Sequence, residues 1–233
     1  MLKRLAYLLF FVALLQNPSY SQKGEYFILN YLPKDYGNVG PNQNSLAQDN
    51  EGRIFVVGES GVLVYDGINW QPVFLPDQIT GYSVVCDKKG TVYVGADNGE
   101  FFIIEKNKRG KFIYNRLKQN LHPKDQSNEP IKQILLHDNK IYFLSADKLI
   151  EYKDNEFVKS FTPQNAFHIR ALPIGKHLFV IDLDNNMLVL EGGVMKYVAN
   201  TENLVSSKPF FTYKINPTTY AIGFRNEGIY KAT

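Results

Sequence analysis

Hydrophobic and polar positions alternate along much of the chain in short runs, which are separated by turns rich in Asp, Asn and Gly. Within residues 44–74 this pattern predicts four strands, over 44–48, 53–58, 62–65 and 70–74. Val, Ile, Tyr and Phe fit a pleated, half-buried surface, while Asp, Asn and Gly accept the positive φ that tight reversals require. The segment is therefore predicted to form a four-stranded antiparallel sheet with three tight turns.

The same unit recurs along the chain. The segment "NSLAQDNEGRIFVVGESGVLVYDGINWQPVF" aligns with "YSVVCDKKGTVYVGADNGEFFIIEKNKRGKFIYN", placing Gly52 over Gly90 and Gly61 over Gly99. Both offsets are 38 residues, from 90 − 52 and 99 − 61. Further copies are more degenerate, and we place the five repeats at approximately 42–76, 80–116, 130–162, 167–199 and 208–233.

A four-stranded antiparallel unit repeated at this period is typical of one blade of a β-propeller. We therefore predict an all-β fold, a propeller of about four and a half to five blades, and no amphipathic helix after the N-terminal segment. The fifth repeat ends after about three strands. The alternating segment "EYFILNYL" at 25–32 could supply the missing outer strand and close a five-bladed ring. The alternative is that the chain is a fragment of a larger propeller.

The N-terminal segment has the pattern of a secretory signal peptide. Lys3 and Arg4 precede an apolar run over residues 5–15, which has 15 − 5 + 1 = 11 residues, and the small-residue pattern ending at Ser21 follows. Such a run fits a signal peptide and is shorter than the roughly 20 residues that span a bilayer. We predict cleavage near Ser21, export to the periplasm or the extracellular space, a propeller over 22–233 and no transmembrane segment in the mature chain.

Composition and charge exclude some partners. The formal net charge of +3 comes from 26 basic and 23 acidic residues, and the only basic cluster lies at 106–111. Nucleic-acid binding needs a basic surface with several phosphate contacts, so it is not expected. Cys86 is the only cysteine, which rules out an intramolecular disulfide. Its place in "YSVVCD" predicts a buried, unreactive side chain.

The first repeat also resembles a known family. "QDNEGRIFVVGESGVLVYDGINW" resembles the two-component-regulator propeller repeat, which has an acidic turn with Gly, a β-run ending in Gly, a second Gly turn and a strand closing on Tyr-Asp-Gly. With the preceding "NYLPKDYGNVGPNQNSLAQD", it is similar to the N-terminal propeller of exported Bacteroidetes-type sensors, often followed by a triple-tyrosine-motif domain. The resemblance implies a periplasmic sensor in a two-component or transcriptional signalling system, with a β-sandwich, a membrane helix and an output domain downstream.

Motifs for metal, nucleotide or hydrolase chemistry are missing or incomplete. "DLDNNMLVLEGG" at 182–193 has Asp182, Asp184 and Asn186 at calcium-loop spacing, yet Met187 and Gly193 replace the Gly and Glu that such a loop needs. It is predicted to be a hairpin turn. The four histidines show no ligand spacing and no phosphate-binding glycine loop or Gly-x-Ser-x-Gly elbow occurs. No cofactor, metal site or catalytic residue is predicted.

Propeller ligands commonly meet the channel mouth, where each innermost strand begins. By repeat alignment, the candidate ligand-binding residues there are Asn44, Tyr82, Lys132, His168 and Arg170. Their amide, phenol and cationic groups suit an anionic or hydroxyl-rich ligand, although they could simply solvate the channel entrance. We predict a non-catalytic sensor module that binds a small molecule, a glycan or a partner protein. The alternatives are a secreted carbohydrate-active hydrolase or lyase, for which Glu100 and Glu105 are candidate acids, and a truncated, non-functional sensor fragment.

Overall fold

The computed structural model describes residues 29–37, 39–163, 167–184 and 186–232. The chain divides into a segment of residues 1–31 and a compact unit, Leu32–Thr233. Residues 29–31 form no helix or strand, and every element described below belongs to the second unit. The predicted signal peptide and its cleavage site lie outside the described residues, and so do residues 25–28.

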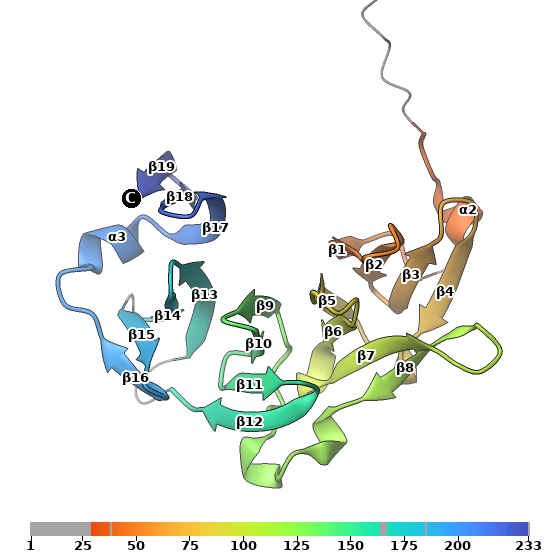
Figure 1. Ribbon diagram of the computed structural model, residues 1–233, viewed down its shortest axis with the longest axis horizontal. Coiled ribbons are helices and arrows are strands. Elements are labelled where there is room, and N and C mark those ends of the chain that lie inside the picture. The colour runs from red at the N-terminus through yellow and green to blue at the C-terminus, as the bar shows by residue number, and fades with distance from the viewer. Residues whose placement is uncertain (1–28, 38, 164–166, 185, 233) are drawn as a thin grey trace, which may run out of the picture. The chain divides into compact units, whose positions relative to one another are not determined.

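The second unit consists of five antiparallel sheets that follow one another in chain order (Figure 1). In each sheet, neighbouring strands are also consecutive in sequence. The first sheet contains β1 (Gln43–Gln48), β2 (Ile54–Gly58), β3 (Gly61–Tyr65) and β4 (Trp70–Phe74). The second contains β5 (Gly81–Cys86), β6 (Val92–Ala96), β7 (Phe101–Lys106) and β8 (Phe112–Arg116). These four-stranded units confirm the predicted blade pattern.

The remaining sheets have the same connectivity. The third contains β9 (Gln133–His137), β10 (Lys140–Leu144), β11 (Leu149–Lys153) and β12 (Glu156–Phe161). The fourth contains β13 (His168–Ile174), β14 (His177–Asp182), β15 (Met187–Glu191) and β16 (Val194–Tyr197). The fifth has three strands, β17 (Pro209–Asn216), β18 (Thr219–Phe224) and β19 (Gly228–Ala232). Among the described residues no strand pairs with the outer edge of β19, and residues 29–32 are not in a strand, so ring closure by 25–32 stays a prediction.

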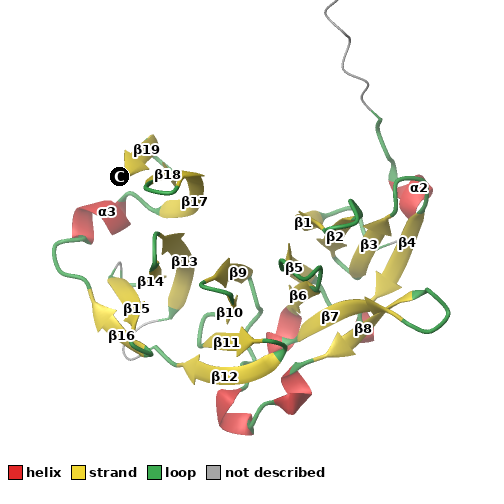
Figure 2. Cartoon of the chain, in the orientation of Figure 1, coloured by secondary structure: helices red, strands yellow, loops and turns green. Residues whose placement is uncertain are grey.

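Short helices lie before β1 and in connections between strands (Figure 2). Two are α-helical, α2 (Pro33–Tyr36) and α3 (Glu202–Ser206). Four more are single 3₁₀ turns, at Pro76–Gln78, Asp97–Gly99, Lys118–Asn120 and Pro123–Asp125. The sequence had predicted no amphipathic helix, and helices of four or five residues are too short to produce the periodic pattern on which that prediction depends.

The hydrophobic core lies between consecutive sheets. Side chains from the facing surfaces of the first and second sheets form one cluster, which includes Phe55, Val62 and Phe102. A second cluster joins the second and third sheets, and a third joins the third and fourth. Each first strand also packs on the first strand of the next sheet, from β1 on β5 to β13 on β17. Burial between sheets is therefore the main force that holds successive repeats together.

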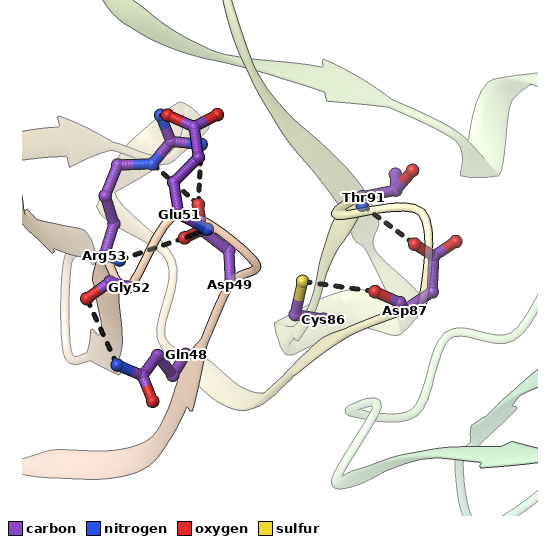
Figure 3. A network of polar contacts seen from close by, with 8 residues as sticks. All are labelled: Gln48, Asp49, Glu51, Gly52, Arg53, Cys86, Asp87 and Thr91. Atoms are coloured by element: carbon purple, nitrogen blue, oxygen red, sulfur yellow. Dashed lines mark hydrogen bonds and ion pairs between the residues drawn. The ribbon is translucent and has the colours of Figure 1, made fainter.

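The acidic turns of the repeat are structural. Oδ1 of Asp49 accepts hydrogen bonds from the backbone N–H groups of Glu51 (3.0 Å) and Arg53 (2.9 Å). Oδ1 of Asp87 accepts one from Thr91 at 2.8 Å in the corresponding turn of the second sheet (Figure 3). One short carboxylate thus satisfies backbone donors that the reversal leaves without strand partners. The Asp and Gly of "QDNEGR" serve the hairpin between the first two strands of the sheet.

Candidate functional site

We call the edge of the sheets at which the first strands β1, β5, β9, β13 and β17 begin the entry edge. The five candidate residues lie at this edge, in or beside the first strands of the first four sheets, and two of them, His168 and Arg170, share β13. In the described part of the chain, a β-bulge interrupts the pairing of the first two strands here in four of the five sheets. Asn44, Tyr82 and Phe210 occupy bulged positions, where the extra residue changes the direction of the side chain.

Asn44 and Tyr82 bind to protein groups. Nδ2 of Asn44 donates a hydrogen bond to the carbonyl oxygen of Gly81, 2.8 Å away on the next sheet. Tyr82 is half-buried and its hydroxyl pairs with the carboxylate of Asp97; burial and this partner raise the pKa of the phenol above its usual value. Both side chains therefore make contacts within the protein, and repeat alignment did not reveal these contacts.

Lys132 and His168 differ in exposure. Lys132 is exposed one residue before β9, and its backbone N–H donates to the carbonyl oxygen of Leu144 at 3.0 Å. His168 is only 5% exposed, and its Nδ1 has no hydrogen-bond partner among the described residues. Burial lowers the pKa of His168, while the nearby carboxylates of Asp182 and Asp147 oppose that shift. The histidine therefore favours its neutral form.

A repeated hydrogen bond links the first strands near the entry edge. Oγ of Ser45 accepts from the backbone N–H of Val84 at 3.3 Å, and Oγ of Ser83 accepts from that of Ile134 at 2.9 Å. On the third sheet a glutamine continues the series. Oε1 of Gln133 accepts from the N–H of the fourth sheet's Ala171 at 2.9 Å, and its Nε2 donates to the same residue's carbonyl oxygen at 2.8 Å.

Arg170 occupies the corresponding position of the fourth sheet and breaks this series. A guanidinium has donors and no acceptor, so it cannot receive the N–H of the next strand. Contact with the fifth sheet is made instead from the other side, where Oγ1 of Thr212 donates to the carbonyl oxygen of Pro173 at 3.0 Å. The side chain of Arg170 lines a cavity between the fourth and fifth sheets, and none of the other four predicted residues lines that cavity.

We call this space the entry cavity; its volume is about 380 Å³. Three cationic side chains and several apolar ones line it, among them Arg170, Lys208, Arg225, Leu183, Val205 and Phe210. No carboxylate is among the described lining residues. Burial lowers the pKa of the Arg170 guanidinium, and the like charge of Arg225 lowers it further.

Sequence reasoning missed Lys208, Phe210 and Arg225, although a signal was present. The residue that follows the second strand is Glu59 in the first sheet, Asp97 in the second and Arg225 in the fifth. The sign of the charge at one repeat position is thus inverted. Comparison of this position across all five repeats would have identified Arg225.

A larger cavity, of about 720 Å³, lies at the opposite edge, among the turns of the second and third sheets. Its lining carries charges of both signs, and Lys89 pairs there with Asp154 at 2.5 Å. Protein groups therefore compensate much of the charge in that cavity. The entry cavity differs because its lining charges have one sign.

The other candidate chemistry is not assembled. Oδ1 of Asp182 accepts from the N–H of Asn186 at 2.8 Å, as expected of a hairpin turn, and position 185 lies outside the described residues. Glu100 pairs with Arg116 at 3.1 Å just before β7, whereas Glu105 lies near the other end of that strand. No group of three potential metal ligands occurs in the described part of the chain.

Cys86 was predicted to be buried, but its side chain is only partly buried and packs against the cluster between the first and second sheets. Burial raises the pKa of its thiol, and the charges of Asp49 and Asp87 raise it further. Figure 3 shows its Sγ directed toward the carbonyl oxygen of Asp87, to which it donates at 3.5 Å. The thiol is thus kept protonated, which agrees with the predicted role as a small packing residue.

Comparisons with solved structures identify the fold. The chain is similar to the extracellular domain of a hybrid two-component system of B. thetaiotaomicron, with a TM-score of 0.62 and 15% identity over 83% of this chain and 27% of that one. It is also similar to the WD40 β-propeller domain of Doa1 (0.59, 12%, covering 82% and 64%) and to virginiamycin B lyase of Staphylococcus aureus (0.57, 12%, covering 81% and 69%).

These structures confirm that the chain folds as a β-propeller of about five blades. The first neighbour is an extracellular domain of a two-component system, which agrees with the family that the first repeat resembles, and this chain spans 27% of its length. No protein-family profile and no curated protein sequence matches the chain. Within the described residues, no helix has both the length and the apolar character needed to cross a bilayer.

Proposed function

We propose that this chain is the ligand-binding propeller of an exported sensor, that it performs no catalysis, and that its ligand binds in the entry cavity. The observation that carries the proposal is the position of Arg170. It is a predicted site residue, it leaves the hydrogen-bond series that joins the other first strands, and its side chain lines a cavity. A side chain that gives up a repeated structural contact to line a cavity is a candidate for ligand recognition.

The sensor role and export are inferred from the first repeat and its structural neighbour. The neighbour is the extracellular domain of a two-component system, and the N-terminal residues have the pattern of a signal peptide. Because this chain spans 27% of that neighbour, the signal would be passed to further segments or to a partner protein. Export is tested by expressing the full chain in a Gram-negative host and measuring the mass of the periplasmic product, which should begin near Gln22.

The binding role is tested with the purified mature chain and a panel of neutral oligosaccharides, short peptides and small organic acids. A ligand that binds only the folded state raises its stability by RT ln(1 + [L]/Kd), about 2.7 kcal/mol at 100 times Kd. We expect at least one class to raise the unfolding temperature in a dose-dependent way. We also expect the NMR spectrum of that ligand to be unchanged after incubation with the chain, because the proposal includes no catalysis.

Two results would contradict the proposal. Conversion of a ligand to a new product would favour the alternative of a propeller hydrolase or lyase. No stabilisation by any member of the panel would remove the evidence for ligand binding and favour the non-functional fragment.

A further inference from the structure

Within the described part of the chain, Arg170 and Arg225 lack the carboxylate partners that Arg53 and Arg116 have. Arg53 pairs with Asp49 at 2.6 Å, and Arg116 pairs with Glu100 at 3.1 Å. No described carboxylate lies within ion-pair distance of either cavity arginine, and no described residue accepts a hydrogen bond from their guanidinium groups. The entry cavity therefore brings together like charges whose mutual repulsion no described protein group compensates.

The fold does not require these cations. The N–H of Arg225 donates to the carbonyl oxygen of Lys208 at 3.1 Å, and in the second sheet the N–H of Asp97 donates to that of Thr80 at 3.0 Å. The same backbone contact thus joins an acidic and a neutral residue, Asp97 and Thr80, at the second sheet. At the fifth sheet it joins two basic residues. Because the turn forms with residues of either charge, the backbone does not require these cations, and a bound anion would account for their gathering at one cavity.

The apolar lining limits what kind of anion fits. Phe210 is 41% exposed and Leu183 is 60% exposed, although both are large hydrophobic side chains. They lie beside Val205, which is only 1% exposed. An inorganic ion would leave this surface in water, whereas a ligand with an apolar body would cover it.

We propose that the entry cavity binds a small organic anion, whose carboxylate or phosphate group pairs with Arg170 and Arg225 and whose aromatic or branched aliphatic body packs against Phe210 and Leu183. Lys208 adds a third positive charge at the rim. A cavity of about 380 Å³ lies near the lower end of the range for small-molecule sites, which suits a single ring with its acidic group. This inference rests on the proposed function, because it names the ligand class of the same site.

The test uses the purified mature chain and four probes: phenyl phosphate, phenylacetate, neutral phenylacetamide and inorganic phosphate. Calorimetry and thermal unfolding should show binding of the two aromatic anions, with inorganic phosphate and phenylacetamide each at least about 10-fold weaker. Arg170→Gln and Arg225→Gln should each weaken binding of the aromatic anions about 10- to 100-fold. The matched control is Arg109→Gln, which removes one positive charge at an exposed hairpin tip.

Arg225 is exposed, so Arg225→Gln keeps the test valid even if Arg170→Gln fails to fold. Phe210→Ala should weaken phenyl phosphate and leave inorganic phosphate unchanged. Equal binding of phenylacetamide and phenylacetate, or no binding of any aromatic anion at millimolar concentration, would overturn the inference. An equal loss of affinity for the aromatic anions in Arg109→Gln would also overturn the inference, because the effect would then come from net charge alone. The proposed function would survive these results if a neutral ligand from the panel stabilised the chain, and would fail only if none did.

Discussion

The interface between the first and second sheets differs from that between the fourth and fifth. The first contains thirteen buried hydrophobic residues, whereas the cluster behind the entry cavity contains four, contributed by the fourth sheet and α3. Ser45 links the first pair of sheets by the repeated hydrogen bond, and Arg170 interrupts it at the last pair. Among the described residues, the first interface has the larger buried core, while the last has fewer buried hydrophobic residues and lacks the repeated hydrogen bond where the cations gather.

This difference shows how a repeat fold can separate stability from function. The backbone of each repeat is set by alternation and by turn residues, so the side chains at the entry edge can differ from one sheet to the next. Side chains that continue the hydrogen-bond series stabilise the contact between neighbouring sheets. Side chains that break the series are available to bind a ligand. The predictions below test this division, from the largest expected effect to the smallest.

The largest contrast is expected between two phenylalanines. Phe55 is 1% exposed in the first interface and packs edge-to-face on Phe112, with ring centroids 5.7 Å apart. Phe55→Ala should lower the free energy of unfolding by about 3–5 kcal/mol. Phe210→Ala at the entry cavity should lower it by less than about 1 kcal/mol, because that ring is already 41% exposed. Urea titration of both variants measures the difference, and equal losses would contradict the contrast.

Close packing of the second sheet on the connection between β8 and β9 should be equally sensitive at Gly99. An added Cβ there would lie 2.0 Å from the carbonyl oxygen of Ser127, and φ is +65°. Gly192 has φ +57° with open space around it, so it is the matched control. Gly192→Ala should cost about 1–2 kcal/mol from the backbone alone, and Gly99→Ala about 1–3 kcal/mol more. Similar unfolding temperatures for the two variants would show that the contact is not tight.

The hydrogen-bond series should contribute a measurable amount at each link. Ser83→Ala leaves the N–H of Ile134 without its acceptor and should cost about 1–3 kcal/mol. Arg170→Gln should instead stabilise the unliganded chain by about 0.5–1 kcal/mol, since it removes a charge near Arg225. Ser206→Ala, on the exposed side of α3, is the control and should change stability by less than about 0.5 kcal/mol. A destabilised Arg170→Gln would indicate that this arginine has a structural role.

A smaller effect is expected from pH. Burial lowers the pKa of His168 in the folded state, so below its ordinary value of about 6.5 the unfolded chain binds the extra proton more readily. Stability should therefore fall as pH decreases from 7 toward the lowered pKa and stay level above 7. His168→Gln should reduce this slope in thermal unfolding between pH 5 and 7. His122→Gln, at an exposed site, should keep it; an unchanged slope in His168→Gln would exclude the histidine as its source.

The sequence predicted the sheets well because alternation and turn residues are local signals. In the first repeat the predicted strand 70–74 coincides with β4, and 44–48 begins one residue after β1. Helix α3 was missed because five residues do not produce a helical period. Local patterns were enough to predict the fold class, but they could not predict the short helices in the connections.

The site could be predicted only in part. Repeat alignment placed Arg170 at the entry edge, since strand starts are a local feature. It did not show that Asn44 is bound to Gly81, nor that Arg225 approaches Arg170, because both facts depend on packing between sheets. Ligand sites built between repeats require such contacts, and a single sequence records them only indirectly.

The most direct test of the central claim is hydrogen exchange along the purified mature chain, with and without phenyl phosphate. Without ligand, amides of β13, β17 and α3 should exchange faster than those of β2, β3 and β6, because fewer buried contacts protect the last interface. With phenyl phosphate, added protection should be confined to β13, α3 and the start of β17. Protection at β1–β8, or none at all, would contradict the account that the least packed interface carries the binding site.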